Sequence, residues 1–513
     1  MPGLGAIALT LLSALPAACA GAPVDEPGRS GEPGGGAGVV LFDPAPMGTR
    51  PQAPAEPPDP FELWRRREPI YELYVRHFSD EGTFAAVEER LPELRALGIG
   101  IVWLLPVNQI GSIWVDHGKA TDAPHGNPYA VKDHRRINAE YGRERTEESA
   151  EADLASLVAT AHELGMRVIL DWVPNHTAWD NPLLEQHPDW YVWKDGAVQP
   201  VSDQFPWIAQ LDWSKQGLRE YMTEVMVDWT ERYQLDGFRI DFAHSMPLDW
   251  FDELRAELEL VRPVFLLAEA GAVGFHPTFD MTYDWDLYPL FGEVASGAKP
   301  VTALDDALLN TQLLPYADMP EALVMRMTYN HDDNGKFTLA ERYRGGIRTF
   351  AVLAATLPGK PLVFDGQEAG MRVFDGAAVQ DSINLGHDPK VKIDWSDPDD
   401  YRSFYTKLLQ LFRANPALHQ PGMADFRKID TAPEHPAYSF MRRAGEDAVL
   451  VVLNLSAQQL LQVALQPAPN AGSIEGTYVE LFTGETQALH GGTSMDLAPW
   501  EYRVYVRGPL HGD

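Results

Sequence analysis

Acidic side chains recur where apolar, strand-like segments of the sequence end. Asp171, Asp241 and Glu269 lie at the ends of three such segments, and Asp332 follows a fourth. Cleavage of an acetal such as a glycosidic bond requires one carboxyl group that is protonated and another that is ionised beside an oxocarbenium-like centre. Carboxyl groups that converge from separate strands could therefore perform this chemistry.

Basic side chains accompany these acids. Arg239 precedes Asp241 by two residues on the same predicted strand, so both side chains share one face and the guanidinium should keep Asp241 ionised. Burial and neighbouring negative charge should raise the pKa of Glu269, which predicts a proton donor. His176 and His331 end two of the segments. A helix cap explains one acid at a strand end, but not several on separate strands.

The elements that would position these residues alternate along the chain. Helical patterns such as Ala85–Leu97, a helix beginning at Thr146 and Gln216–Tyr233 separate most of the apolar segments. Eight βα units predict a (β/α)₈ TIM barrel, in which the carboxyl ends of all strands meet at one rim. The eight predicted strands are Ile70–Phe78, Ile99–Pro106, Met166–Pro174, Asp236–Phe242, Pro263–Glu269, Phe279–Tyr283, Leu323–Asn330 and Lys360–Asp365.

Further segments complete the predicted domain organisation. The catalytic barrel should span residues 61–415, with a short insertion at 177–213 after the third strand and another at 107–129 after the second. Beyond the helix Tyr401–Ala414, short alternating segments predict an antiparallel β-sandwich domain over residues 416–513. Its expected strands are Ala437–Arg442, Ala448–Ser456, Leu460–Leu465, Thr477–Phe482 and Trp500–Val506.

The N-terminal region has a different composition. An apolar run ends in small residues and Cys19, which is typical of an export signal over residues 1–19 and resembles a bacterial lipoprotein signal. Lipidation of Cys19 would anchor an exported protein to the cell envelope, on the periplasmic or the cell-surface side; an ordinary cleavable signal is the alternative. Residues 20–60 are rich in Gly and Pro and predict a disordered tether.

Charge and cysteine content exclude several classes of function. With 41 Lys and Arg against 74 Asp and Glu, the net charge of −33 disfavours binding to nucleic acid or to an anionic membrane face. A neutral sugar needs no matching charge. The single cysteine excludes a disulfide framework and a thiolate metal cluster.

Four blocks in order along the chain resemble the α-amylase superfamily of glycoside hydrolases. They are DWVPNH at 171–176, GFRID at 237–241, LLAEA at 266–270 and YNHD at 329–332. The resemblance runs from about Ile70 to the C-terminus. Weaker matches lie at 128–142, 209–213 and 362–370.

The resemblance implies a role for each matched residue. Asp241 would be the nucleophile, Glu269 the general acid and base, and Asp332 the third acid, which binds sugar hydroxyls and stabilises the transition state. The implied substrate-binding residues are Asp171, Arg239, His176, His331, Tyr129 as a stacking platform, and His244, which replaces a common lysine of the family. Asn175 matches a calcium ligand of the family, so a structural Ca²⁺ is an option that the resemblance implies. The resemblance implies no cofactor for the chemistry itself.

The resemblance implies a retaining hydrolase of starch-like or maltodextrin-like α-glucans, and a retaining mechanism predicts that the carboxyl groups of Asp241 and Glu269 lie about 5 to 5.5 Å apart. A transglycosylase or isomerase of the same superfamily is the alternative, because it would use the same acids. A non-catalytic glucan-binding barrel is disfavoured because all three acids are present. A metal-dependent hydrolase is disfavoured because no His-x-His pair lies between Ile70 and Asp171. Both α-1,4 and α-1,6 linkages are compatible with these blocks, and no pattern specifies an oligomeric state.

Overall fold

The computed structural model describes residues 60–116, 119–122, 126–308, 319, 322–333, 337–370, 392–419, 426–431, 436–467 and 472–511. Cys19, the predicted export signal and the predicted tether up to residue 59 lie outside the described residues. Among the described residues, no helix has the length and apolar character needed to cross a membrane.

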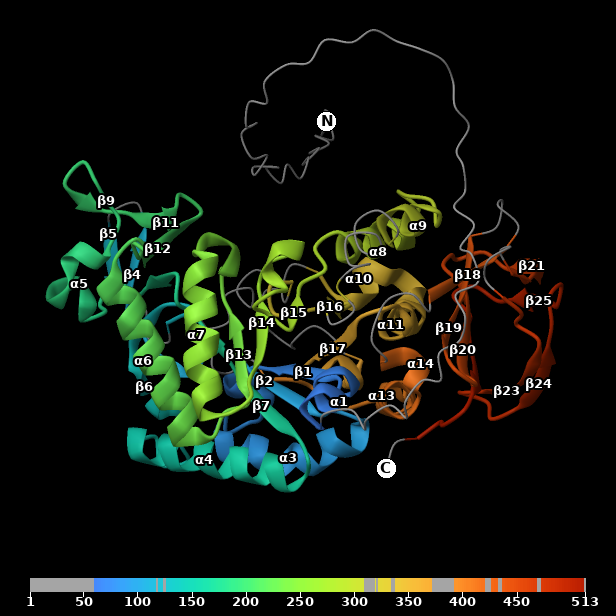
Figure 1. Cartoon of the computed structure of the whole chain (residues 1–513), viewed down its shortest axis with the longest axis horizontal. Helices are drawn as coiled ribbons and strands as arrows, with labels where there is room; N and C mark the ends of the chain where they lie inside the picture. Colours follow the sequence, from blue (N-terminus) through green and yellow to red (C-terminus); the bar gives the residue numbers. More distant parts are fainter. Residues whose placement is uncertain are drawn as a thin grey trace, which may run out of the picture. The chain divides into compact units, whose positions relative to one another are not determined.

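Eight parallel strands close into a barrel, which confirms the predicted fold class. Each predicted strand supplies one barrel strand (Figure 1). The barrel strands are β1 (Ile70–Leu73), β2 (Ile101–Leu104), β7 (Arg167–Trp172), β13 (Gly237–Ile240), β14 (Phe265–Ala268), β15 (Met281–Thr282), β16 (Leu323–Arg326) and β17 (Lys360–Phe364).

The prediction of one strand over Ile70–Phe78 is wrong, because the chain turns after Leu73. The backbone N–H of Tyr74 donates to the Asp365 carboxylate at 2.9 Å instead of extending the sheet. The carbonyl of Tyr74 then accepts hydrogen bonds from the backbone N–H groups of His77 and Phe78, so residues 75–78 form the short helix α2. The other barrel strands are also shorter than predicted.

Helices cover the outside of the barrel, with α3, α4, α6 and α7 beside β2, β7 and β13 in Figure 1. The Thr146 hydroxyl accepts from the backbone N–H of Ser149 and caps α4, and Gly98 ends α3 in the left-handed region. The helices are α1 (Pro60–Arg67), α2 (Val75–Phe78), α3 (Phe84–Leu97), α4 (Glu147–Glu163), α5 (Leu183–Gln186), α6 (Gln216–Tyr233), α7 (Leu248–Val261), α8 (Leu287–Ser296), α9 (Ala303–Ala307), α10 (Leu339–Tyr343), α11 (Ile347–Thr356), α13 (Tyr401–Ala414) and α14 (Pro416–His419).

The barrel interior changes from apolar to polar along the strands. Ile70, Ile101 and Ile169 belong to a buried apolar cluster. Two residues further along β1 and β7, Glu72 and Asp171 are also fully buried. Since side chains two residues apart share a face, the polar layer lies toward the carboxyl ends of the strands.

Two insertions extend the rim of the barrel. After β2, β3 (Asn108–Ile110) pairs with β6 (Val131–Ile137), and β4 (Ile113–Asp116) pairs with β5 (Lys119–Asp122). After β7, a three-stranded sheet has the order β11-β12-β8, and β9 pairs with β10. These strands are β8 (His176–Thr177), β9 (Trp193–Lys194), β10 (Ala197–Val198), β11 (Pro200–Ser202) and β12 (Phe205–Gln210).

The C-terminal region is an antiparallel β domain, as predicted. A seven-stranded sheet has the order β22-β18-β19-β20-β26-β23-β24, and β21 pairs with β25. The sequence analysis missed β18, β22, β24 and β25. The strands are β18 (Phe426–Asp430), β19 (Ala437–Ala444), β20 (Asp447–Asn454), β21 (Leu460–Ala464), β22 (Gln466–Pro467), β23 (Gly476–Glu480), β24 (Thr486–Leu489), β25 (Ser494–Leu497) and β26 (Tyr502–Arg507).

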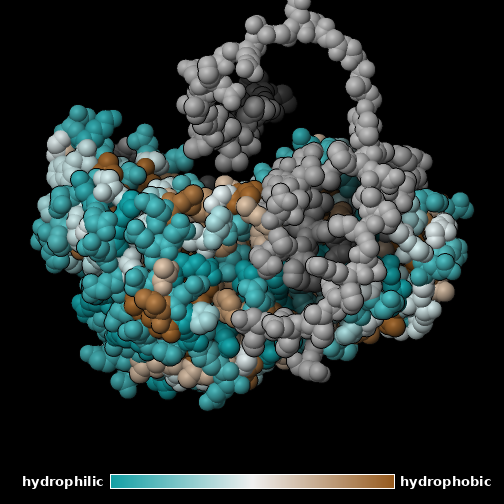
Figure 2. Space-filling view, in the orientation of Figure 1, coloured by the Kyte–Doolittle hydropathy of each residue, from teal (hydrophilic) through white to brown (hydrophobic). Residues whose placement is uncertain are grey.

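The C-terminal domain contacts the barrel through buried and half-buried groups. Thr349 of α11 donates a hydrogen bond to the backbone carbonyl of Trp500, and Arg442 donates to the carbonyl of Thr356 at 3.2 Å. The predicted boundary between residues 415 and 416 lies between α13 and α14. The described surface in Figure 2 is mainly hydrophilic, with a few separate hydrophobic patches.

Candidate active site

A single buried arginine holds the acids of the barrel rim together. Nη1 of Arg239 donates to Oδ1 of Asp171 and to Oδ1 of Asp241, at 2.9 Å in each case. Nη2 of the same guanidinium lies 3.1 Å from Oε2 of Glu269, and Nε donates to the Tyr283 hydroxyl at 3.2 Å. The structure thus brings together three of the acids that the sequence analysis selected.

Strand pairing explains this convergence. Arg239 is in register with Asp171 on β7 and with Leu267 on β14. The backbone N–H of Asp241 donates to the carbonyl of Trp172 at 2.9 Å, and that of Glu269 to Ile240 at 3.1 Å. Both acids are therefore fixed by backbone pairing directly beyond the ends of their strands.

Gly237, at the start of β13, is required by close packing. Its φ is +147°, and an added Cβ atom would lie 1.9 Å from the carbonyl oxygen of Phe265. Any side chain here would push β13 away from β14 and displace Arg239 with it.

The two central acids differ in their remaining contacts. Oδ2 of Asp241 is buried and has no hydrogen-bond partner among the described residues, although Nε2 of His176 lies 3.9 Å away. Oε2 of Glu269 accepts a hydrogen bond from the backbone N–H of Phe242 at 2.6 Å. Phe242 has φ +51°, so a left-handed residue directly after Asp241 directs its amide at Glu269. Asp241 keeps one oxygen available for attack.

Burial dominates the ionisation of this pair. It raises the pKa of Asp241 to about 7 and that of Glu269 to about 7, while Arg239 lowers both values. The negative charge of Asp241 also raises the pKa of Glu269. Because each charge opposes the other, the pair should hold one proton near neutral pH, so that one group can donate it while the other attacks.

A second group of contacts links Tyr129 to His331. The Tyr129 hydroxyl donates to Oδ2 of Asp171 at 2.8 Å and lies 2.9 Å from Nε2 of His331. The two rings stack with centroids 5.3 Å apart. Oδ1 of Asp332 lies 3.5 Å from Nε2 of His331, and its side chain is 44% exposed. Asp332 therefore lies beside the buried cluster on its solvent-facing side.

The two remaining predicted histidines have different environments. Burial lowers the pKa of His176 to about 3, so its ring is neutral. Its Nε2 lies 3.0 Å from the carbonyl of Tyr129 and its Nδ1 lies 3.4 Å from the Asn175 amide, so both nitrogens have protein partners. His244 is exposed, with Nδ1 3.4 Å from the carbonyl of Glu269. Contacts of these histidines with sugar stay predictions.

The side chain of Asn175, the residue that matches a calcium ligand, has His176 as its neighbour. Its side-chain amide lies against the ring of His176. Asp180, an acid of the insertion after β7, pairs with Lys132 at 3.2 Å and accepts from Ser112 at 2.9 Å. Among the residues that the structure describes, no three His, Cys, Asp or Glu side chains gather as metal ligands. Calcium needs about six to eight oxygen ligands.

The sequence analysis missed three contributors to this site. Glu72 contacts His331, Tyr283 accepts from Arg239, and the backbone of Phe242 binds Glu269. Glu72 was detectable, because an acid at an inward-facing position of a buried strand is unusual. The backbone conformation of Phe242 left no signal in the sequence.

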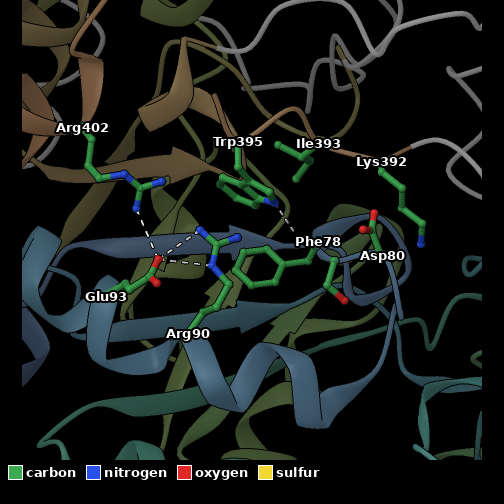
Figure 3. A pocket seen from close by; sticks show the side chains of 9 residues that line it. Phe78, Asp80, Arg90, Glu93, Lys392, Ile393, Trp395 and Arg402 are labelled. Atoms are coloured by element: carbon green, nitrogen blue, oxygen red, sulfur yellow. Dashed lines mark hydrogen bonds and ion pairs between the residues drawn. The ribbon is translucent and has the colours of Figure 1, made fainter. Parts of the chain in front are cut away.

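A separate cavity of about 400 Å³ lies between α2, α3 and α13 (Figure 3). The guanidinium of Arg90 lies 3.7 Å from the ring centroid of Trp395. Glu93 accepts from Arg90 at 3.3 Å and pairs with Arg402 at 3.5 Å. The lining includes none of the predicted site residues, and its basic side chains (Arg90, Lys392 and Arg402) outnumber its acidic ones (Asp80 and Glu93) by one.

Comparisons with known proteins find a family model that matches part of this chain. Residues 58–262 match the family model described as the α-amylase catalytic domain. An α-amylase of Haloarcula japonica is 27% identical over 416 residues, which are 77% of this chain and 56% of that protein. The chain therefore spans little more than half of this relative.

One further relative and one solved structure are also similar to this chain. An α-1,4-glucan:maltose-1-phosphate maltosyltransferase of Pseudomonas aeruginosa is 28% identical over 84% of this chain and 66% of its own length. The solved structure of a noncanonic maltogenic α-amylase from Thermotoga neapolitana aligns with a TM-score of 0.71 and 24% identity. That alignment covers 87% of this chain and all of the other, which shows a shared fold.

Proposed function

We propose that this chain, an enzyme of the α-amylase superfamily of glycoside hydrolases, hydrolyses α-glucosidic bonds in starch-like or maltodextrin-like α-glucans with retention of configuration. The observation that carries this proposal is the shared guanidinium of Arg239, which holds Asp241 and Glu269 in one buried cluster. The relatives named above, which include an α-amylase and a maltosyltransferase, support an α-glucan as substrate.

In the proposed first step, the unpartnered Oδ2 of Asp241 forms a bond to the anomeric carbon while the glycosidic carbon–oxygen bond breaks. Glu269 gives its proton to the departing sugar oxygen. In the second step, water attacks the anomeric carbon, Glu269 accepts the water proton, and Asp241 leaves. The sum of both steps is the addition of one water molecule across the bond.

The surrounding groups would orient the reacting sugar. Asp332, exposed beside His331, can accept hydrogen bonds from sugar hydroxyls. Tyr129 is nearly buried and one face of its ring stacks on His331, so only a small part remains to contact a pyranose. His244 lies near the carbonyl of Glu269 and would contact the leaving group.

Transfer to a second sugar is the alternative reaction of the same site. The similarity to a maltosyltransferase supports this alternative, because hydrolysis and transfer differ only in the acceptor of the second step. Product analysis separates the two. Maltoheptaose should yield glucose, maltose or other short products under hydrolysis, whereas transfer would yield chains longer than the substrate.

The nucleophile is tested with an Asp241→Asn variant, which should lose about 10⁴-fold or more in kcat. Proton NMR of the first product should show the α-anomer in the wild-type reaction. Formation of the β-anomer, or unchanged turnover of Asp241→Asn, would contradict a covalent mechanism through Asp241. A Glu269→Gln variant assayed with a glycosyl fluoride separates the roles, because fluoride departs without an acid.

We also propose export and lipid anchoring through Cys19, with the enzyme held at the cell envelope. The apolar run that ends at Cys19 supports this proposal. Expressed in a bacterial host, the wild-type chain should partition into detergent and incorporate labelled palmitate. Cys19→Ser should do neither. Equal partitioning of both chains would contradict the anchor.

A further inference from the structure

A buried carboxylate on the first barrel strand contacts the proposed site from within the barrel. Glu72 of β1 is fully buried. Its Oε1 contacts Nδ1 of His331 and also lies 3.4 Å from the backbone N–H of the same residue. The sequence separation of 259 residues makes this a contact that only the closed barrel creates.

The hydrogen bonds around His331 determine its charge. An ionised Glu72 accepts hydrogen bonds only, so Nδ1 of His331 must carry a proton. On the other side, the Tyr129 hydroxyl donates its single proton to Asp171 and can only accept from Nε2 of His331. Nε2 must then carry a proton as well. A ring with both nitrogens protonated is an imidazolium.

The rest of the environment is consistent with this charge. The groups facing His331 are Glu72 from β1, Trp103 from β2, and Tyr129, Asp171, Arg239 and Asp332. Burial and Arg239 lower the pKa of His331, whereas Asp332 and Glu72 raise it, and the resulting value is about 9. Oε2 of Glu72 has no hydrogen-bond partner among the described residues, whereas Oε1 contacts His331.

We propose that Glu72 is a positioning residue that keeps His331 as an imidazolium, so that its charged Nε2–H holds the Tyr129 hydroxyl and a positive charge lies beside Asp332 and the bound sugar. This inference rests on the proposed function of the site. A charged donor makes a stronger hydrogen bond to the Tyr129 hydroxyl than a neutral one does. The positive ring also lies 3.5 Å from the Asp332 carboxyl group.

The raised pKa of His331 determines how its charge depends on pH. A His331 whose pKa is raised is charged below about pH 9 and loses its charge above it. Removal of the negative charge of Glu72 lowers that value, so the imidazolium should be lost at lower pH. A Glu72 that only holds β1 against the neighbouring strands would affect stability and leave this titration unchanged.

The test uses Glu72→Gln, which keeps the size and one acceptor of the side chain but removes its charge. The substrate is maltosyl fluoride, whose leaving group needs no proton from Glu269. The alkaline limb of kcat/KM should move down by at least about one pH unit. Glu72→Asp, which keeps the charge, should restore part of the shift. An unmoved limb in Glu72→Gln would overturn the inference.

Glu368→Gln is a matched control. Glu368 is also fully buried and accepts from the Tyr71 hydroxyl at 2.6 Å, but no contact with His331 is described. We expect it to lower the melting temperature without moving the alkaline limb. An equal shift in both variants would overturn a specific action of Glu72.

A direct measurement keeps the inference testable if Glu72→Gln does not fold. In the wild-type protein, ¹⁵N NMR of labelled histidine, assigned with a His331→Gln variant, should show both ring nitrogens of His331 protonated at pH 7. A neutral ring would overturn the inference. Wild-type protein that does not cleave maltosyl fluoride or maltoheptaose would instead contradict the proposed function, and the NMR result would still stand.

Discussion

At the scale of single residues, one guanidinium contacts three of the buried acidic side chains. Arg239 binds Asp171 and Asp241 and lies against Glu269, all within the barrel. A planar guanidinium can face several carboxylates at once, whereas an ammonium group is a point charge with a different reach. The geometry of the acids therefore depends on the shape of this cation as well as on its charge.

Arg239→Lys should accordingly keep the charge and lose most of the activity. We expect kcat/KM on maltoheptaose to fall by about 10³-fold, because one ammonium cannot hold Asp171, Asp241 and Glu269 in place together. Steady-state kinetics measures the change, and circular dichroism verifies folding. A loss below about tenfold would show that charge alone suffices.

The pH dependence of activity also belongs to this scale. Burial raises the pKa of Glu269 to about 7, so the proton needed by the leaving group is present below that pH and lost above it. On maltoheptaose, kcat/KM should fall as the pH rises through about 7. On maltosyl fluoride, this limb should disappear. Persistence of the limb near pH 7 with the fluoride would assign it to another group.

At the scale of elements, the eight barrel strands were predictable because buried parallel strands are nearly continuous apolar runs. The ends were less predictable. The turn after Leu73 depends on Asp365, which is distant in the sequence and binds the backbone of Tyr74. The positions of Asp241 and Glu269 followed from their strands, but the contact between Glu72 and His331 requires closure of the barrel.

Gly237 tests how strictly strand packing sets the site. Gly237→Ala should destabilise the protein by at least about 2 kcal/mol, because the added Cβ would overlap the carbonyl of Phe265. Gly196→Ala is the control, since Gly196 also has a positive φ of +79° but no atom within 4 Å of an added Cβ. Urea denaturation of both variants measures the difference. Equal losses would attribute the effect to backbone conformation alone.

At the scale of the barrel and the C-terminal domain together, the C-terminal sheet packs on helices that follow barrel strands. Trp500 lies against Gly345 and Gly346, where added Cβ atoms would come within 2.6 and 2.7 Å of its ring. The backbone of the same residue accepts from Thr349 of α11. The β domain thus contacts the barrel through the helix α11.

Removal of this contact should affect stability more than catalysis. Trp500→Ala should cost about 2 kcal/mol in urea denaturation and leave KM for maltoheptaose within about twofold. Trp193→Ala is the control, because the Trp193 side chain is 52% exposed. A large rise in KM for Trp500→Ala would indicate that the β domain contributes to substrate binding.

Metal removal tests the donor set around Asn175. The described residues do not gather as calcium ligands there, so we expect a chelator to leave the melting temperature unchanged. Differential scanning calorimetry with and without EDTA measures this. A fall of several degrees, reversed by Ca²⁺, would show a calcium site and contradict this expectation.

Tyr129 is held by residues of β7 and β8 and by the chain beyond β16. Its hydroxyl donates to Asp171 and its carbonyl accepts from His176, while its ring rests on His331. The surface that would bind a sugar ring is therefore already formed in the absence of ligand. Rapid-mixing fluorescence with an inactive Asp241→Asn enzyme should then record a single association phase whose rate rises linearly with maltoheptaose concentration. A rate that reaches a plateau would mean that the site changes conformation when maltoheptaose binds.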